Sequence, residues 1–168
     1  LTSGYLLDGD VPRYKIYDAS EDIVYDGFPS VDYPFSQNGL FHVLYLDGIY
    51  TQTLDLVGGS NLISFYALPD DNSIGNVLSG IEASNPGALG EGASAIFVNN
   101  LGWIGGLLSI DRQDGYWIKV TDATDLNVEG LPTEPGTVYS LHGGSNLISY
   151  PFAGFAPLVE TIPVDAQS

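Results

Sequence analysis

The sequence predicts an all-β protein made of β-sandwich-like modules, with one short helix in the central module. Three observations predict this fold class. Short segments rich in β-branched and aromatic residues recur along the chain, each bounded by Gly, Asp, Asn or Pro. Only one stretch has helical periodicity. The 21 glycines and 10 prolines in 168 residues supply the turns that many short strands need.

Ten segments have strand character and make up the predicted sheets. They are residues 13–17, 23–25, 40–46, 50–56, 61–66, 95–98, 116–121, 126–128, 137–141 and 146–152. The segment with the sequence DGYWIKV shows the pattern well, because strand alternation puts Tyr116, Ile118 and Val120 on one face and Trp117 and Lys119 on the other.

The single predicted helix lies in the stretch PDDNSIGNVLSGIEA. Pro69 ends the preceding strand, and Asp71 or Asn72 is suited to cap the helix. Its apolar residues recur at i, i+3, i+4 and i+7, namely Ile74, Val77, Leu78 and Ile81. Two glycines within the stretch weaken it, so we expect a short amphipathic helix.

The heptapeptide GGSNLIS occurs twice, 85 positions apart, starting at Gly58 and again at Gly143. Over nine positions from Leu56 and from Leu141, eight residues are identical. The paired glycines are suited to a tight turn into a strand, and the Asn61 side chain is suited to bond neighbouring backbone. The motif is therefore interpreted as a device that sets strand register.

A second, weaker repeat relates two similar segments, KIYDASE, starting at Lys15, and KVTDATD, starting at Lys119. Together the two repeats predict three parts. Residues 1–50 are the closing part of a β-module, residues 51–135 are a complete central module, and residues 136–168 are the opening part of a second copy.

The charge balance limits the partners of this protein. With 21 acidic and 4 basic residues the net charge is −17, which disfavours nucleic acid and anionic membranes as partners. The chain has no apolar run long enough to insert into a membrane, and it contains no cysteine. The acidic surface is typical of soluble proteins exposed to salt, and a first residue other than Met indicates a processed piece. We therefore expect an extracellular protein at the cell surface.

No catalytic motif stands out, so the sequence predicts that the protein is not an enzyme and needs no cofactor. Of the two histidines, His42 lies in an apolar strand segment, and His142 aligns with Val57 of the first repeat, so the repeated fold needs no histidine there. Calcium remains an alternative because carboxylates cluster at several places. These clusters are Asp8 and Asp10; Asp18, Glu21, Asp22 and Asp26; Asp70, Asp71 and Asn72; and Asp122, Asp125 and Asn127. The simpler interpretation is turn-forming Asp on a solvated face.

The repeated GxNLIS segments and the DGYWIKV strand resemble the repeat module found in tandem in large secreted bacterial surface proteins. In that module a GWNLIS strand opens the unit and a GYWIKV strand closes it, and here Ser60 and Ser145 replace the Trp. The stretch GDVPRYKIYDAS resembles the end of a second β-module that accompanies it. The resemblance implies an extracellular β-sandwich-like architecture with an adhesive or structural role.

Two functional hypotheses follow. The first is a structural protein of a cell-surface fibre or tandem-repeat adhesin, in which the tail of one copy joins the head of the next by strand addition. Its candidate interface residues are Tyr139, Leu141, Leu147, Ile148, Tyr150, Phe152, Tyr14 and Ile16. The alternative is a carbohydrate-binding module that binds polysaccharide through aromatic rings. Its candidate residues are Trp103, Trp117 and Tyr33.

Overall fold

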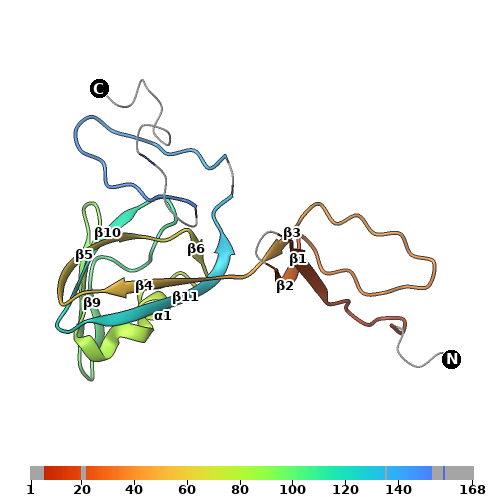
Figure 1. Ribbon diagram of the computed structural model, residues 1–168, viewed down its shortest axis with the longest axis horizontal. Coiled ribbons are helices and arrows are strands. Elements are labelled where there is room, and N and C mark those ends of the chain that lie inside the picture. Colours follow the sequence, from red (N-terminus) through yellow and green to blue (C-terminus); the bar gives the residue numbers. More distant parts are fainter. Residues whose placement is uncertain (1–5, 20–21, 135, 153–156, 158–168) are drawn as a thin grey trace.

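The computed structural model describes residues 6–19, 22–134, 136–152 and 157, and it shows an all-β protein with three antiparallel sheets. Figure 1 shows two parts, a central module and an arm that projects away from it. The arm, here residues 6–48, contains β1 (Tyr14–Asp18), β2 (Ile23–Pro29) and β3 (Leu46–Gly48), which pair in the order β1-β2-β3. After β3 the chain passes directly into β4 (Tyr50–Leu56) of the central module.

The central module packs two sheets and a helical segment around one core. A sheet of five strands has the order β5-β10-β7-β8-β9, and a sheet of three has the order β4-β11-β6. These strands are β5 (Gly59–Ser64), β6 (Ala67–Leu68), β7 (Gly87–Leu89), β8 (Ser94–Val98), β9 (Gly102–Gly105), β10 (Gly115–Val120) and β11 (Thr124–Pro132). Both sheets contribute buried side chains to the same cluster, among them Ile118 from β10 and Leu126 from β11. The predicted β-sandwich-like architecture is therefore confirmed for this module.

Strand β10 has the predicted alternation. Tyr116, Ile118 and Val120 are at most 1% exposed, whereas Trp117 on the opposite face is 42% exposed. On one side β10 pairs with β5 over six residues, from Gly115 opposite Ser64 to Val120 opposite Gly59. On the other side it pairs with β7, so β10 is an interior strand of the five-stranded sheet.

The predicted helix is present but divided. It consists of one α-helical turn, α1 (Ile74–Val77), followed by the 3₁₀ segment η1 (Ser79–Ser84). All four predicted apolar residues are buried. The N-cap is Ser73 rather than Asp71 or Asn72, and the Asp71 carboxylate accepts a hydrogen bond from the Ser73 N–H at 3.1 Å. An Asx turn thus precedes the helix in place of a side-chain cap.

Three of the predicted strands are absent or incomplete in the structure. Of residues 40–46 only Leu46 belongs to a strand, residues 137–141 form none, and residues 146–152 contribute a single bridge, at Ile148. Four short strands were missed, namely β3, β6, β7 and β9. The apolar residues of the three segments have strand propensity, but no neighbouring strand within the described residues pairs with them fully, and strands form only in pairs.

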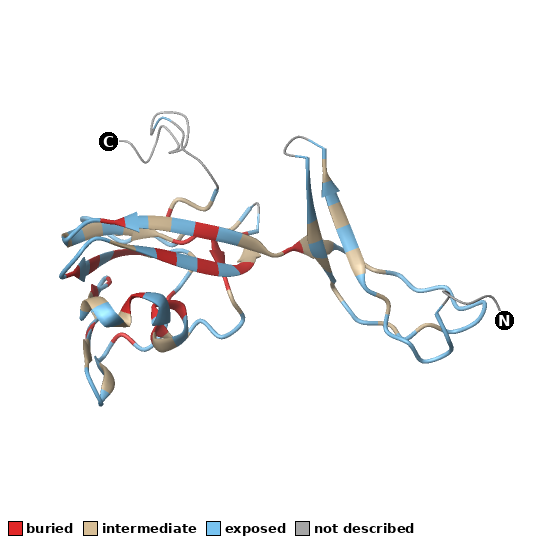
Figure 2. Cartoon of the chain, turned by 60° about the horizontal axis from the view of Figure 1, so that its bottom comes forward, coloured by how far each residue is buried: buried red, intermediate tan, exposed pale blue. Residues whose placement is uncertain are grey.

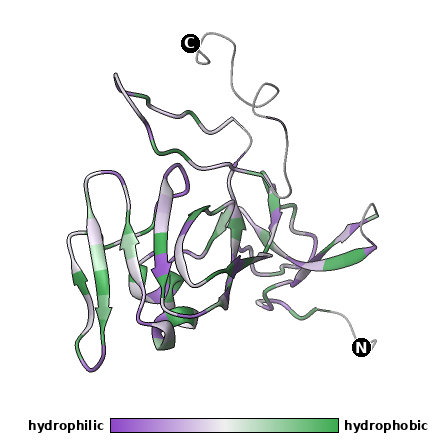
Figure 3. Ribbon diagram, turned by 60° about the vertical axis from the view of Figure 1, so that its left-hand side comes forward, coloured by the Kyte–Doolittle hydropathy of each residue, from purple (hydrophilic) through white to green (hydrophobic). Residues whose placement is uncertain are grey.

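The arm has almost no core of its own. None of the described residues from 6 to 47 is buried, whereas the central module in Figure 2 carries most of the buried positions. Large apolar side chains on the arm are exposed, including Leu40 at 98% and Leu44 at 74%. Figure 3 shows hydrophobic stretches on the arm as well as in the central strands. A small sheet without a covered apolar face is at best marginally stable by itself.

A close backbone contact at Gly130 leads to a prediction about the stability of the central module. A Cβ atom there would lie 2.0 Å from the carbonyl carbon of Leu68, at the junction of β11 and β6. We expect Gly130→Ala to lower the free energy of unfolding by about 2 kcal/mol or more, because backbone rather than a flexible side chain must move. Denaturant unfolding checks this. Gly106→Ala is the control, since no atom lies within 4 Å of that position, and equal losses in both variants would contradict the contact argument.

Candidate assembly site

The two copies of GGSNLIS form the same local turn. In the first copy the Asn61 side-chain oxygen accepts a hydrogen bond from the Val57 N–H at 2.9 Å, and its amide nitrogen donates to the Val57 carbonyl at 2.9 Å. In the second copy Asn146 makes the same pair of bonds with His142, both at 2.9 Å. Gly59 and Gly144 have φ values of 109° and 100°. The predicted turn function of the motif is thus confirmed in both copies.

Beyond the turn, the surroundings of the two copies differ. In the first copy the Asn61 amide also donates across to the Ile118 carbonyl at 3.3 Å, and the following strand pairs with β10. In the second copy Ile148 makes one isolated antiparallel bridge with Asp114, flanked by the Gly115 N–H bonding the Leu147 carbonyl and the Ser149 N–H bonding the Gln113 carbonyl, both at 2.9 Å. The second copy is therefore a formed turn without the strand neighbour that the first copy has.

Side chains also hold the second copy against the central module. The Glu91 carboxylate contacts His142 and accepts a hydrogen bond from the Leu147 N–H at 3.2 Å. Ser149 is 6% exposed, hydrogen-bonded to Tyr139 and to the Arg112 carbonyl. The bonds to His142 and to the Leu147 N–H lower the pKa of Glu91. Bonds to the Gly143 carbonyl and then to Glu91 raise the pKa of His142.

These shifts predict a pH window for the contact. Glu91 contributes above its ordinary pKa of 4.5, and that contribution is lost as pH falls through its lowered pKa. His142 contributes below its ordinary pKa of 6.5 and loses that contribution as pH rises through its raised pKa. We expect the amide hydrogens of residues 142–149 to be best protected from exchange between these two values. A Glu91→Gln variant should lose the fall in protection on the acid side but keep part of the fall on the alkaline side, because the His142 bond to the Gly143 carbonyl remains. A wild-type profile without a maximum would contradict the contact.

The predicted interface residues form two separate groups. Tyr14 and Ile16 lie half-buried on β1 of the arm. Tyr139, Leu141, Leu147, Ile148, Tyr150 and Phe152 follow β11 in the segment that passes over the central module. Of these, Leu141 and Phe152 are 54% and 51% exposed, and the Tyr150 and Phe152 rings meet edge to face with centroids 5.8 Å apart. Figure 1 shows that the two groups do not meet within one chain.

The three aromatic residues of the carbohydrate hypothesis are not brought together either. Trp103 lies on β9, partly buried against the core and beside Phe97. Trp117 lies on β10, with β7 and β8 between it and β9. Three strand spacings separate β10 from β9, which is about 14 Å. Tyr33 is on the arm and stacks on Phe41. No shared sugar platform results from this arrangement.

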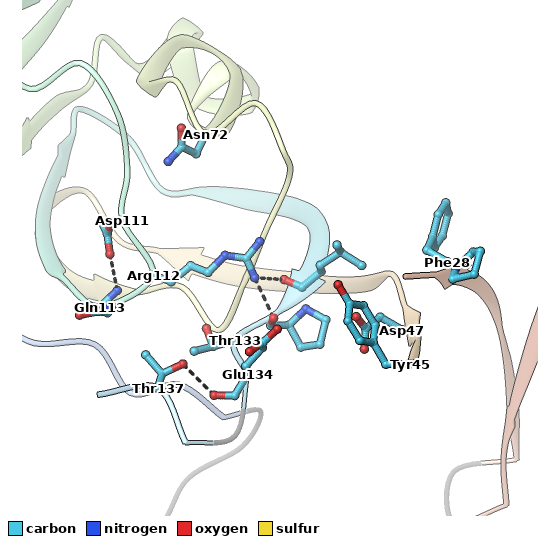
Figure 4. A pocket seen from close by; sticks show the side chains of 13 residues that line it. Phe28, Tyr45, Asp47, Asn72, Asp111, Arg112, Gln113, Thr133, Glu134 and Thr137 are labelled. Carbon is cyan, nitrogen blue, oxygen red and sulfur yellow. Dashed lines mark hydrogen bonds between the residues drawn. The ribbon is translucent and has the colours of Figure 1, made fainter. Parts of the chain in front are cut away.

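A cleft of about 520 Å³ lies between the arm and the central module, and no sequence motif predicted it. Figure 4 shows Phe28 and Tyr45 on the arm side of the cleft, and Arg112 and neighbouring polar residues on the module side. The Arg112 guanidinium donates to the carbonyls of Leu131, Pro132 and Leu68 at 2.6, 2.7 and 2.8 Å. The guanidinium thus holds β11 and β6 together. The remaining groups that line the cleft include aromatic rings, amides and carboxylates.

The carboxylate clusters of the sequence mostly hold turns. Asp8 accepts from the Gln37 N–H and Asp10 from the Leu7 N–H, while Asp26 pairs with Lys15. Glu21 lies outside the described residues. Among the residues that are described, no three His, Asp or Glu side chains form a group that could hold a metal ion. Likewise, no hydrogen bond within that part of the chain joins a histidine to a Ser or Thr hydroxyl.

No protein-family model matches this chain, and comparisons with curated proteins and with solved structures found no match. None of the helices in the described part of the chain has the length and apolar character needed to cross a bilayer.

Proposed function

We propose that this protein is an extracellular structural protein, a subunit of a cell-surface fibre or tandem-repeat adhesin whose copies join head to tail. The observation that carries the proposal is the second copy of GGSNLIS. It makes the same Asn turn as the first copy but has one bridge where the first copy has a six-residue strand pairing. Exposed strand edges of this kind are templates for another chain.

The arm has an exposed apolar surface suited to such a contact. Its described residues up to 47 are never buried, and twelve of the twenty-four exposed large apolar side chains of the described residues lie on it. An apolar surface of this kind typically marks an interaction site. Because the arm and the second copy are different surfaces, a contact between them in two molecules is heterologous. Such contacts repeat without closing and therefore build fibres.

The acidic surface fits an extracellular location. At a net charge of −17, copies repel one another in dilute buffer, and salt reduces this repulsion by shortening the Debye length to roughly 8 Å at physiological ionic strength. We therefore expect assembly to be stronger as salt rises. A structural role also agrees with a site that consists of backbone edges and turns rather than a catalytic group.

Light scattering across a concentration series, followed by electron microscopy, tests the proposal. The expected result is scattering that rises with concentration and salt, together with fibres of regular axial repeat. A compact monomer at the highest concentration and at every salt level would contradict it. The full chain is used, because the arm and the second copy must both be present.

Glycan binding is a second candidate, and the cleft between arm and module is the observation that favours it. Phe28 and Tyr45 offer rings for a sugar face, and Asn72, Gln113 and Glu134 offer hydrogen-bonding groups. Calorimetry with neutral oligosaccharides should give binding heat that Tyr45→Ala removes. Trp117→Ala is the control because that residue does not line the cleft. Equal binding by both variants would place any glycan elsewhere.

A further inference from the structure

The two sheets of the central module have different outer faces. Where β4 and β11 pair, the outward residues are polar and exposed, and they include Asp55, Asp125 and Glu129. This is the usual pattern of an antiparallel sheet with its core on one side and water on the other. By contrast, the strands of the five-stranded sheet contain no Asp, Glu or Arg, and Lys119 is their only charged residue. The five-stranded sheet therefore lacks the outer face that a solvated sheet normally has.

A band of exposed apolar side chains crosses the outer face of the five-stranded sheet. Leu62, Trp117 and Leu89 form a row, because Trp117 lies opposite Leu62 on β5 and opposite Leu89 on β7. Ile96 and Ile104 lie opposite one another on β8 and β9, and the pairing of β7 with β8 places Ile96 diagonally next to Leu89. All five side chains are between 42% and 57% exposed. Each strand thus contributes one large apolar side chain to this surface, here called the outer band.

The outer band is separate from the core of the module. Strand alternation places the neighbouring residues on the opposite face, where Ala88, Ala95, Tyr116 and Ile118 are at most 3% exposed. A contiguous exposed apolar patch that spans several strands is uncommon on a soluble monomer, and such patches mark interaction sites. The outer band is therefore suited to be covered by another molecule.

Charge and shape favour a second copy of this chain as that molecule. Each copy has a net charge of −17, so two copies repel one another at most of their surfaces. A contact through the outer face of the three-stranded sheet would bring Asp55, Asp125 and Glu129 of both copies together, whereas the outer band brings no carboxylate. The aliphatic stem of Lys119 adds apolar surface while its ammonium stays in water. Two flat apolar sheet faces pack about 10 Å apart in β-sandwiches, so the outer band is complementary to itself.

We propose that two copies pair through their outer bands in an isologous contact, related by a two-fold axis. Strand spacings of about 4.8 Å and strands of up to six residues give the sheet face a flat footprint of roughly 400 Å². Stable interfaces bury about 800 Å² per partner, so this contact forms a weak dimer whose population depends on concentration. The pairing closes on itself and does not depend on the head-to-tail contact proposed above. In a fibre it joins two filaments side by side.

Sedimentation equilibrium of the full chain over a concentration series measures the dimer, and acrylamide quenching of tryptophan fluorescence locates the contact. Trp117 is 42% exposed on the outer band, whereas Trp103 packs against the core. We therefore expect acrylamide quenching to decrease as the dimer forms. Because salt screens the repulsion between copies, the dimer should also become stronger as salt rises.

Two substitutions that add the same charge to opposite faces of the module test the pairing. Ile96→Glu places a carboxylate on each half of the contact, and it should raise the dimer dissociation constant at least about 100-fold. Thr53→Glu is the matched control, because Thr53 is exposed on the outer face of β4, and this variant should dimerise as the unmodified chain does. Denaturant unfolding checks that both variants fold. Ile96→Glu leaves the second GGSNLIS copy unchanged, so it should still form fibres, and loss of pairing is seen separately from loss of head-to-tail assembly.

A dimer that Ile96→Glu loses and Thr53→Glu keeps, with quenching that follows the dimer, supports the proposal. Equal weakening by both substitutions, or a dimer without a change in Trp117 quenching, would assign the pairing to another surface and overturn it. Trp117 that is shielded at every concentration would mean that a segment of the same chain covers the band. Shielding only by added polysaccharide would assign the band to a glycan, and either result overturns the pairing.

Discussion

An Asn146→Ala variant should fail to form fibres while its central module stays as stable as in the unmodified chain. Asn146 holds the turn of the second copy through bonds to the backbone of His142 and Gly144. Without these bonds the open edge that follows is no longer held in one conformation for pairing. We expect the onset concentration for light scattering to increase by about tenfold or more, which is equivalent to ~1.4 kcal/mol per joint.

The internal repeat provides the matched control. Asn61 makes the same bonds in the first copy and one more to the Ile118 carbonyl, so it stabilises the central module itself. Asn61→Ala should therefore lower the free energy of unfolding by about 2 kcal/mol. The two substitutions are chemically identical, so they separate stability from assembly. Fibres formed by Asn146→Ala at the unmodified concentration would contradict the role given to the second copy.

Replacing Ile118 by alanine should give the largest loss of stability in the central module. Ile118 is fully buried on β10, between β5 and β7, in the core that both sheets share. Truncation of a buried isoleucine removes packing and leaves a cavity, so the expected loss is about 4 kcal/mol of unfolding free energy. Denaturant unfolding followed by circular dichroism measures it.

Trp117→Ala on the same strand is the control for Ile118→Ala. The Trp117 side chain is 42% exposed and lies between Leu62 and Leu89 on the outer face. Loss of these cross-strand contacts should cost about 1 kcal/mol. If Trp117→Ala were as destabilising as Ile118→Ala, the outer face of β10 would have to be covered, and the assignment of inner and outer faces would be wrong.

Local features were predictable from the sequence wherever the cause is local. The GGSNLIS turn depends on a glycine with positive φ and on an Asn that bonds nearby backbone, and both copies form it. The alternation of β10 and the apolar face of the helical segment follow from strand and helix periodicity. The all-β class follows from the number of such strands and turns.

Features that depend on a partner distant in sequence were not predictable. Residues 40–46, 137–141 and 146–152 have strand composition, but a strand also needs a neighbour, and within the described residues they have at most partial ones. Three other features likewise depend on how distant segments meet. They are the hydrogen bonds from Arg112 to three carbonyls, the partial burial of Trp103 and the cleft beside the arm.

The sequence by itself therefore determined the turns, the face pattern of the strands and the existence of two repeats, because these depend on neighbouring residues. Only the tertiary structure decided which repeat has a strand partner. The first copy pairs with β10 because the same chain supplies that strand beside it. The second copy docks by its other edge, which leaves the equivalent backbone groups without a partner among the described residues.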